Sequence, residues 1–161
     1  MKKLIPFILI FLASCTTTNY YVVRHAEKAG QGAGMSSDVP LSEAGLQRAK
    51  ALEAKLHAVN IKKIYSTNTI RTTSTAKPLS DLTKVRIELY DARDTGFINR
   101  LKALNKKNIL IVGHSNTVDD VVNGLMGEKV LSDLADPEYG DVFIVKKKGK
   151  NLKFIKERFG Q

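Results

Sequence analysis

The strongest constraint on the fold is a regular alternation of strand-like and helix-like segments along a chain of 161 residues. Short runs of β-branched and aromatic residues, bounded by glycine, proline, serine and asparagine, indicate strands, whereas apolar residues spaced three and four apart indicate helices. The run 108–112 is almost wholly apolar, as in strands that are buried on both faces of a parallel sheet. The alternation predicts an α/β fold, a three-layer α/β/α sandwich around a mostly parallel sheet.

The pattern also predicts where these elements lie. We expect strands at residues 20–23, 61–65, 85–90, 108–112, 142–146 and 152–158. We expect helices at residues 42–57, 69–79, 97–104 and 118–125, with Ser42 as the N-cap of the first. The turn Lys148-Gly149-Lys150 joins the last two strands as an antiparallel hairpin. No internal repeat is visible, so residues 20–161 are predicted to form one domain.

The first 14 residues are predicted to be a signal peptide. Two lysines precede an apolar stretch at residues 4–13, which is too short to span a bilayer because a spanning helix needs about 20 residues. The sequence Leu-Ala-Ser-Cys at residues 12–15 resembles the lipobox of bacterial lipoproteins. This resemblance implies lipidation of Cys15, a short tether at residues 15–19, and a lipid-anchored protein of the bacterial cell envelope that faces the periplasm or the exterior. An ordinary signal peptide followed by a chance cysteine is the alternative.

Composition excludes several classes of protein. With 43% apolar and 26% charged residues the chain is an ordinary globular domain, and its single cysteine excludes an intrachain disulfide and a Cys-rich zinc site. Much of the net charge of +10 comes from lysines of the segment 146–158. These lysines fit a solvated edge hairpin that resists aggregation, or a surface for nucleic acid, anionic lipid or an anionic substrate. Nucleic acid is not an expected partner, because Phe154 and Phe159 are the only aromatic residues of this region.

Arginine and histidine residues follow three of the expected strands. Arg24 and His25 end the first strand, Arg71 opens the helix after the second, and His114 and Ser115 follow the run 108–112. Because ligands bind at the carboxyl ends of parallel strands, these side chains are expected to meet. Two arginines suit a phosphate, and they lower the pKa of a nearby imidazole so that a neutral histidine can attack phosphorus. A metal site is disfavoured because two arginines repel a cation, and no cofactor is expected.

Four segments, in this order, resemble the motifs of the histidine phosphatase superfamily, whose best-known members are phosphoglycerate mutases. They are Val-Arg-His-Ala-Glu at 23–27, Pro-Leu-Ser-Glu-Ala-Gly-Leu-Gln-Arg-Ala at 40–49, the segment 64–76 with its serine, arginine and threonines, and Val-Gly-His-Ser at 112–115. The resemblance implies a phosphoglycerate mutase-like fold and a metal-independent phosphatase that forms a phosphohistidine on His25. It also implies that Arg24 and Arg71 bind the phosphoryl group, and that His114, with Ser115 beside it, completes the pocket.

The resemblance leaves open which residue is the general acid that protonates the leaving group. Members that act on phosphomonoesters have an acidic residue just after the third strand, and Leu-Tyr-Asp at 89–91 fits with Asp91 in that role. Asp94 and Glu88 are the alternatives, and Asp91 and Asp94 also fit as caps of the helix that follows. Phosphohistidine phosphatases of this superfamily can dispense with the acid, because the phosphoramidate bond already has a good leaving group. The substrate implied by this resemblance is therefore a phosphomonoester or a phosphoramidate.

The reaction expected from the sequence is hydrolysis. Only 42 residues separate Arg71 from His114, which leaves little chain for the lid with which a mutase excludes water. A shallow site would admit a large substrate such as a phosphorylated protein or a headgroup phosphate. The alternatives are a catalytically silent, lipid-tethered module that binds phosphate, and a membrane-surface or nucleic-acid binder that uses the segment 146–158. The sequence does not indicate the oligomeric state.

Overall fold

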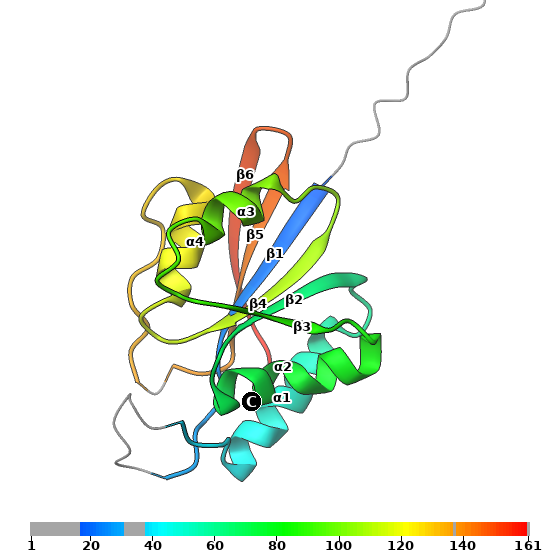
Figure 1. The fold of residues 1–161 in the computed structure, drawn as a ribbon, viewed down its shortest axis with the longest axis vertical. Coiled ribbons are helices and arrows are strands. Elements are labelled where there is room, and N and C mark those ends of the chain that lie inside the picture. The colour runs from blue at the N-terminus through cyan, green and yellow to red at the C-terminus, as the bar shows by residue number, and fades with distance from the viewer. Residues whose placement is uncertain (1–16, 31–37, 137, 161) are drawn as a thin grey trace, which may run out of the picture.

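The computed structural model describes residues 17–30, 38–136 and 138–160, and its elements follow the expected alternating order (Figure 1). The predicted signal peptide and Cys15 lie outside the described residues. The strands are β1 (Thr17–Arg24), β2 (Ile61–Thr67), β3 (Ile87–Tyr90), β4 (Asn108–Gly113), β5 (Asp141–Lys148) and β6 (Asn151–Arg158). The helices are α1 (Glu43–Leu56), α2 (Ile70–Thr83), α3 (Phe97–Ala103) and α4 (Val118–Met126).

The strands form one sheet in the order β3-β2-β4-β1-β5-β6. The pairs β2–β3, β2–β4 and β1–β4 are parallel, whereas β5 pairs antiparallel with both β1 and β6. The mostly parallel sheet with an antiparallel C-terminal hairpin is therefore confirmed. Because β1, β2 and β4 are parallel, their carboxyl ends lie at one edge of the sheet, where a ligand site is expected.

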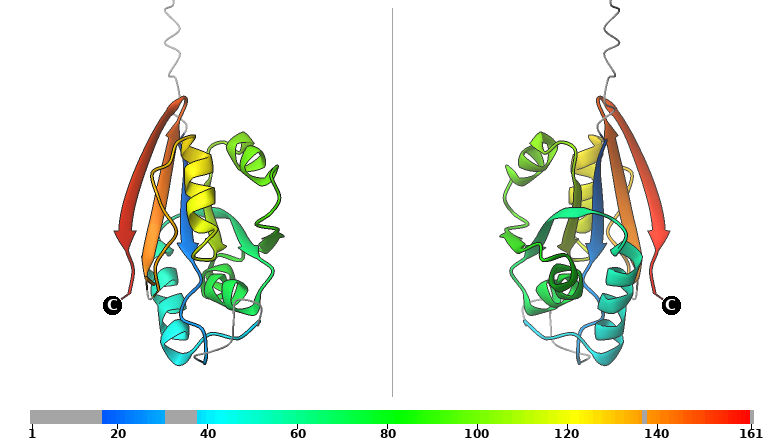
Figure 2. Two further views of the ribbon diagram at one scale, coloured as in Figure 1. Left: turned by 90° about the vertical axis from the view of Figure 1, so that its left-hand side faces the viewer. Right: turned by 90° about the vertical axis from the view of Figure 1, so that its right-hand side faces the viewer.

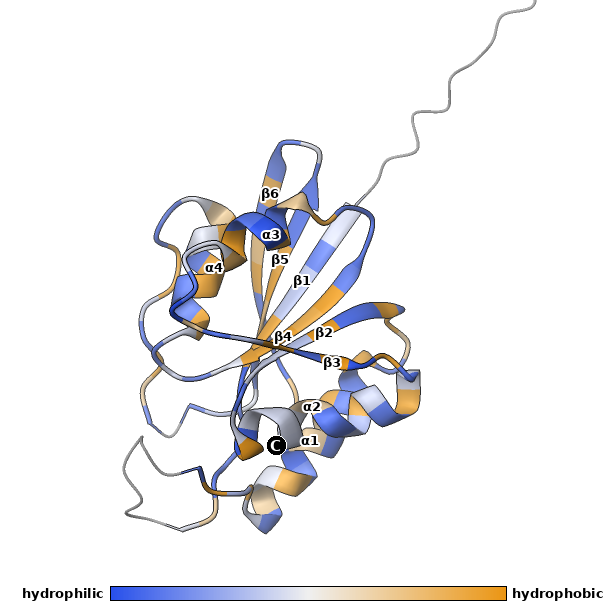
Figure 3. Ribbon diagram, in the orientation of Figure 1, coloured by the Kyte–Doolittle hydropathy of each residue, from blue (hydrophilic) through white to orange (hydrophobic). Residues whose placement is uncertain are grey.

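Helices cover both faces of the sheet, which confirms the three-layer α/β/α sandwich. Neighbouring residues of β1 face opposite sides: Val22 packs with residues of α3 and α4, and Val23 packs with residues of α1 and α2. Figure 2 shows α3 and α4 together on one side of the strands. β4 is the most apolar strand because residues 109–113 are buried on both faces, and Figure 3 shows its hydrophobic colouring.

Several element boundaries differ from the sequence predictions, and two of them, the start of β1 and the end of α2, differ by three residues or more. β1 begins at Thr17 rather than at residue 20, because Thr17 pairs with Lys148 of β5. Residues 17–19 thus belong to the sheet and not to the tether expected at 15–19. α2 continues to Thr83 and ends at Lys84, whose φ of 59° is left-handed. Both differences come from pairing and packing that the local sequence pattern does not show.

The start of α1 holds the segment after β1 in place. As predicted, Ser42 is the N-cap, and its hydroxyl accepts a hydrogen bond of 3.1 Å from the amide of Gly45. A Cβ at Gly45 would lie 2.1 Å from the carbonyl oxygen of Glu27, so glycine allows this close approach. The Glu27 carboxylate forms an ion pair with Arg48 of the same helix at 2.6 Å. These contacts fix the backbone that carries His25.

Candidate active site

The two histidines of the motifs meet at the carboxyl edge of the sheet. Parallel pairing aligns Arg24, the last residue of β1, with Gly113, the last residue of β4. The amide of His25 then donates a hydrogen bond of 2.9 Å to the carbonyl of Gly113. The rings of His25 and His114 consequently lie edge to face, with their centroids 5.4 Å apart.

His25 is a buried, neutral imidazole with one nitrogen left to react. Its Nδ1 lies 2.7 Å from the carbonyl oxygen of Ala26, which can only accept, so Nδ1 carries the proton and Nε2 bears the lone pair. Burial lowers the pKa of His25 to about 4, and the charges of Arg24 and Arg71 lower it as well. The hydrogen bond to Ala26 acts in the opposite direction. At neutral pH the Nε2 atom is therefore available as a nucleophile.

His114 has the opposite tautomer. A guanidinium nitrogen of Arg71 lies 3.3 Å from Nδ1 of His114, and because a guanidinium only donates, Nδ1 must accept. Nε2 then carries the proton, which it donates to the hydroxyl of Thr67 at 2.9 Å. Burial, together with the charges of Arg71 and Arg24, lowers the pKa of His114 to about 4. A phosphate dianion in the site would raise this pKa and turn Nδ1 into a further donor.

Arg71 reaches the site from the first turn of α2. The hydroxyl of Thr69, the N-cap, accepts a hydrogen bond from the amide of Thr72, and this starts the helix directly after β2. Arg71 is 7% exposed, so its charge acts in a partly dry environment. The positive end of the helix dipole adds to the attraction for an anion at this edge.

Arg24 is held by the loop that follows α4. Its guanidinium forms an ion pair with the exposed carboxylate of Asp136 and lies 4.3 Å from the ring centroid of Tyr139. It also donates to the carbonyl of Ala135 at 3.3 Å. Its Nε atom is buried and has no hydrogen-bond acceptor within the described part of the chain. Arg24 is thus ordered in the site but keeps a donor for another group.

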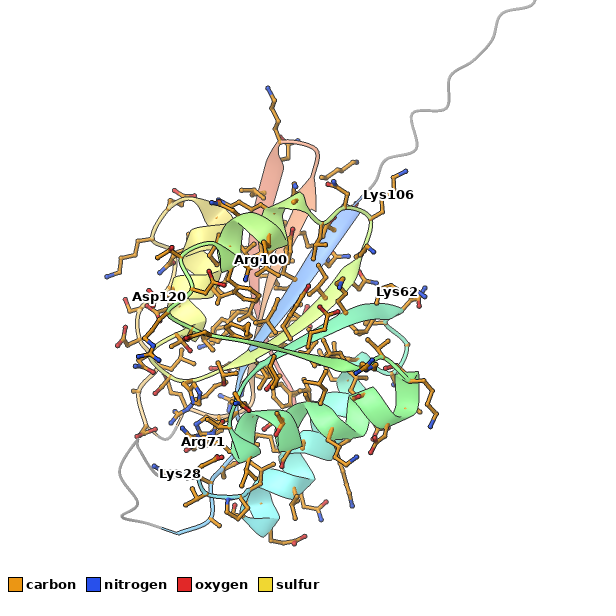
Figure 4. The ribbon with its side chains drawn as sticks, viewed as in Figure 1. Lys28, Lys62, Arg71, Arg100, Lys106 and Asp120 are labelled. Atoms are coloured by element: carbon orange, nitrogen blue, oxygen red, sulfur yellow. The ribbon has the colours of Figure 1, made fainter. Side chains whose placement is uncertain are left out.

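These side chains surround a cavity of about 480 Å³ that suits an anion. Arg24, Lys28, Arg71 and Arg93 line it as cations, and Figure 4 shows Lys28 and Arg71 at the same corner of the molecule. Among the described residues of the lining, Asp136 is the one carboxylate. Hydroxyl and amide groups complete the lining, from Thr69, Ser115, Asn116 and Thr117. Arg24, His25, Arg71, His114 and Ser115 therefore all line this cavity, as the motifs predicted.

Sequence reasoning missed several residues of the cavity. Lys28 and Thr69 lie inside or beside the motif segments and could have been found from that position. Arg93 and Asp136 had no such signal, because only the folded chain brings their loops to the site. The loop of Asp136 is held there by the amide of Leu134, which donates to the carbonyl of Ser115 at 3.0 Å.

The general-acid candidate Asp91 lies beside the site, in the lining of an adjoining cavity that it shares with His114 and Arg93. Its carboxylate is exposed, and the hydrogen bond from the amide of Arg93, together with that residue's charge, lowers its pKa. Asp94 accepts from the amide of Gly96 and pairs with Arg100 at 2.5 Å, and Glu88 pairs with Lys63 at 2.6 Å. Asp91 and Asp94 therefore support local turns, but the prediction that they cap the following helix is wrong, because the N-cap of α3 is Gly96 and no side chain caps it.

Two properties of the described residues bear on the type of site. No group of three or more histidine, cysteine, aspartate or glutamate side chains among them is placed to hold a metal ion. None of the helices in this part of the chain has both the length and the apolar character needed to cross a bilayer.

A comparison of the sequence with protein-family models adds to this geometric description. Residues 20–93 match the model of the histidine phosphatase superfamily, branch 1. This match covers the first three motif segments, and the fold supplies the fourth at the same cavity. Over these residues the chain is similar to the histidine phosphatase superfamily. No curated protein matches the sequence.

Solved structures share the fold at low sequence identity. The protein histidine phosphatase SixA complexed with tungstate is 18% identical, with a TM-score of 0.67 over 87% of this chain and 96% of that one. Phosphoserine phosphatase from Entamoeba histolytica, in complex with 3-phosphoglyceric acid, is 15% identical, with a TM-score of 0.60 over 89% and 97%. YhfR from Bacillus stearothermophilus is 20% identical, with a TM-score of 0.58 over 84% and 94%. These likenesses confirm the fold.

Proposed function

We propose that this protein is a phosphatase that hydrolyses a phosphomonoester or a phosphoramidate through a phosphohistidine on His25. The observation that carries the proposal is the state of His25, which is buried, neutral and hydrogen-bonded through Nδ1 so that Nε2 is free to attack. Arg24, Arg71 and His114 line the same cavity and supply donors for a tetrahedral anion. The solved fold relative SixA is complexed with such an anion, tungstate.

In the first step, the lone pair on Nε2 of His25 attacks phosphorus. A P–N bond forms while the bond from phosphorus to the leaving group breaks, and the leaving group departs with that electron pair and takes up a proton. The imidazole becomes positively charged, and the Ala26 carbonyl that accepts from Nδ1 stabilises this charge. Arg24 and Arg71 bind the equatorial oxygens, whose charge they neutralise without a metal ion.

In the second step, water attacks the phosphorus of the phosphohistidine. The P–N bond breaks, its electron pair returns to Nε2 of His25, and inorganic phosphate leaves with a proton transferred to solvent. Water reaches the phosphoenzyme because the cavity is open, and this favours hydrolysis over mutase action. His114 stabilises the phosphoryl oxygens once the bound anion has raised its pKa.

The leaving group decides how much acid catalysis the reaction needs. The carboxylate of Asp91 is exposed and its pKa is lowered, so it is ionised at neutral pH and is a poor proton donor in the ligand-free protein. This favours substrates whose leaving group departs readily, such as the imidazole of a phosphohistidine, over simple alkyl esters.

The experiment is to trap the intermediate. Wild-type protein mixed with a labelled phosphohistidine peptide and quenched in alkali should carry the label on His25. The variant His25→Ala should retain its fold, by circular dichroism, and lose label and turnover. His57→Ala is the matched control, because His57 is exposed at the end of α1. Phosphate binding without label or turnover in the wild type would instead identify the catalytically silent binding module.

We also propose that Cys15 is lipidated and anchors the protein to a membrane of the bacterial cell envelope. The support is the lipobox-like sequence at residues 12–15. In cells fed a radioactive fatty acid, wild-type protein should take up label and sediment with membranes, and Cys15→Ser should do neither. Label retained by Cys15→Ser would refute the anchor.

A further inference from the structure

The amino end of β1 is surrounded by lysines from two segments that are distant in the sequence. Thr17 pairs with Lys148 in the sheet, and the amide of Asn19 donates a hydrogen bond of 2.9 Å to the carbonyl of Lys107. The amine of Lys147 donates to the carbonyl of Lys102 at 2.6 Å, so the two segments touch. We call the segments 102–108 and 146–153 the lysine-rich end. They contain eight lysines and no acidic residue.

An apolar cavity lies among these lysines. It has a volume of about 300 Å³ and lies between the two segments and the end of α4. Leu125, Met126 and Leu152 contribute apolar lining, and Leu152 is 39% exposed. The lining also includes three lysines, Lys102, Lys147 and Lys150. Apolar surface next to flexible cationic side chains matches the boundary between anionic headgroups and acyl chains of a bilayer.

The lysine-rich end and the candidate active site lie at opposite ends of β1. Figure 4 shows Lys106 near the amino end of β1, and Lys28 and Arg71 at the other end of the molecule. From Thr17 to His25 the extended chain covers about 26 Å, at about 3.3 Å per residue. The predicted lipid on Cys15 would be attached two residues before Thr17, so it would hold the lysine-rich end against the bilayer.

We propose that the lysine-rich end is a docking surface for a bilayer of anionic phospholipid, and that docking holds the candidate active site away from the membrane. The apolar cavity favours lipid over nucleic acid, and the two segments contain no aromatic residue that could stack on bases. Each lysine that approaches an anionic leaflet strengthens binding by about fivefold. A lipid chain combined with a basic surface gives stable attachment where either signal alone is weak. The proposal does not depend on the phosphatase activity.

A fluorophore at a single thiol tests the proposal in the full chain. In the Cys15→Ser background, Leu152→Cys or Leu89→Cys supplies the only thiol, and both positions are exposed, at 39% and 57%. Leu89 lines the cavity next to the candidate active site and reports on that end. The labelled proteins are mixed with vesicles of phosphatidylcholine alone, or of equal amounts of phosphatidylcholine and phosphatidylglycerol. An environment-sensitive fluorophore at position 152 should shift to the blue with the anionic vesicles, and one at position 89 should not.

Charge-reversal variants then distinguish docking through the lysine-rich end from membrane binding by the apolar signal peptide. Lys106→Glu with Lys150→Glu should weaken the partitioning measured at position 152 by at least about 25-fold, because each lysine lost weakens binding about fivefold and each added carboxylate is repelled by the anionic leaflet. The control pair Lys50→Glu with Lys77→Glu changes the net charge by the same amount at exposed positions of α1 and α2. This control should change the partitioning onto vesicles little. An equal shift with neutral vesicles, an equal shift at position 89, or no loss on reversal of Lys106 and Lys150 would each overturn the proposal. So would the absence of any shift.

Discussion

Asp136 pairs its carboxylate with the guanidinium of Arg24, 112 residues away in the sequence, in the lining of the cavity at the candidate active site. The two partners differ sharply in exposure, since the side chain of Arg24 is 7% exposed and that of Asp136 is 79% exposed. The Asp136 carboxylate thus accepts a hydrogen bond from a guanidinium nitrogen inside the cavity lining, and this bond, together with the charge of Arg24, lowers the pKa of Asp136.

Removal of this carboxylate should tighten phosphate binding. An exposed ion pair is worth about 0–1 kcal/mol, so Asp136→Asn should lower the Kd for inorganic phosphate about two- to fivefold in isothermal titration calorimetry. Asp133→Asn removes the same charge from the same loop at an exposed residue outside the cavity lining, and should leave the Kd unchanged. Equal affinities of wild type and Asp136→Asn would show that the carboxylate does not compete with the anion.

Removal of the Arg71 guanidinium should reduce kcat/KM more than removal of a single surface charge does. Its side chain is 7% exposed and contacts His114, so Arg71→Ala should reduce kcat/KM about 10²–10³-fold, or about 2.7–4 kcal/mol. Arg71→Lys should recover only part of this, because an ammonium group lacks the planar fork. The exposed Arg86→Ala is the control. A loss below tenfold in Arg71→Ala would mean that this residue does not bind the transferred group.

The role of Asp91 can be tested by comparing the rates at which one variant hydrolyses two substrates. Because its carboxylate is exposed and ionised, Asp91→Asn should lower the rate less than about threefold for both nitrophenyl phosphate and an alkyl phosphate. Asp94→Asn, in the same loop, serves as the comparison. If the alkyl ester slowed about 10²-fold or more while nitrophenyl phosphate did not, Asp91 would be the general acid and phosphomonoesters the natural substrates.

The buried histidines make the stability of the folded protein depend on pH. The pKa values of His25 and His114 are lowered to about 4, against about 6.5 in an unfolded chain. Between these values the unfolded chain binds protons that the folded protein excludes, so the free energy of unfolding falls as pH falls from 6.5 towards 4.

Urea unfolding at pH 7 and pH 5, without phosphate, should show this loss, at about 2 kcal/mol for each histidine. The loss should become smaller in His25→Gln and in His114→Gln and stay the same in His57→Gln. If the loss in His25→Gln matched that of the wild type, the pKa of His25 would not be lowered in the folded protein.

The sequence by itself determined the order of the elements, the parallel core of the sheet and the meeting of Arg24, His25, Arg71 and His114 at one cavity. Local periodicity is enough for the first two, and the spacing of Arg24, His25, Arg71 and His114 after strands is enough for the third, because parallel strands bring their carboxyl ends together. Ser42 as N-cap is likewise a local property.

Only the tertiary structure decided how those groups work. The tautomer of His114 depends on its contacts with Arg71 and Thr67, and the state of Arg24 depends on Asp136, which lies in a loop without any motif. The lysine-rich end exists because β1 pairs with β5 on one side, which brings the segment 146–153, and with β4 on the other, which brings the segment 102–108. Such contacts join residues tens of positions apart, and their energies depend on burial and geometry that no local pattern contains.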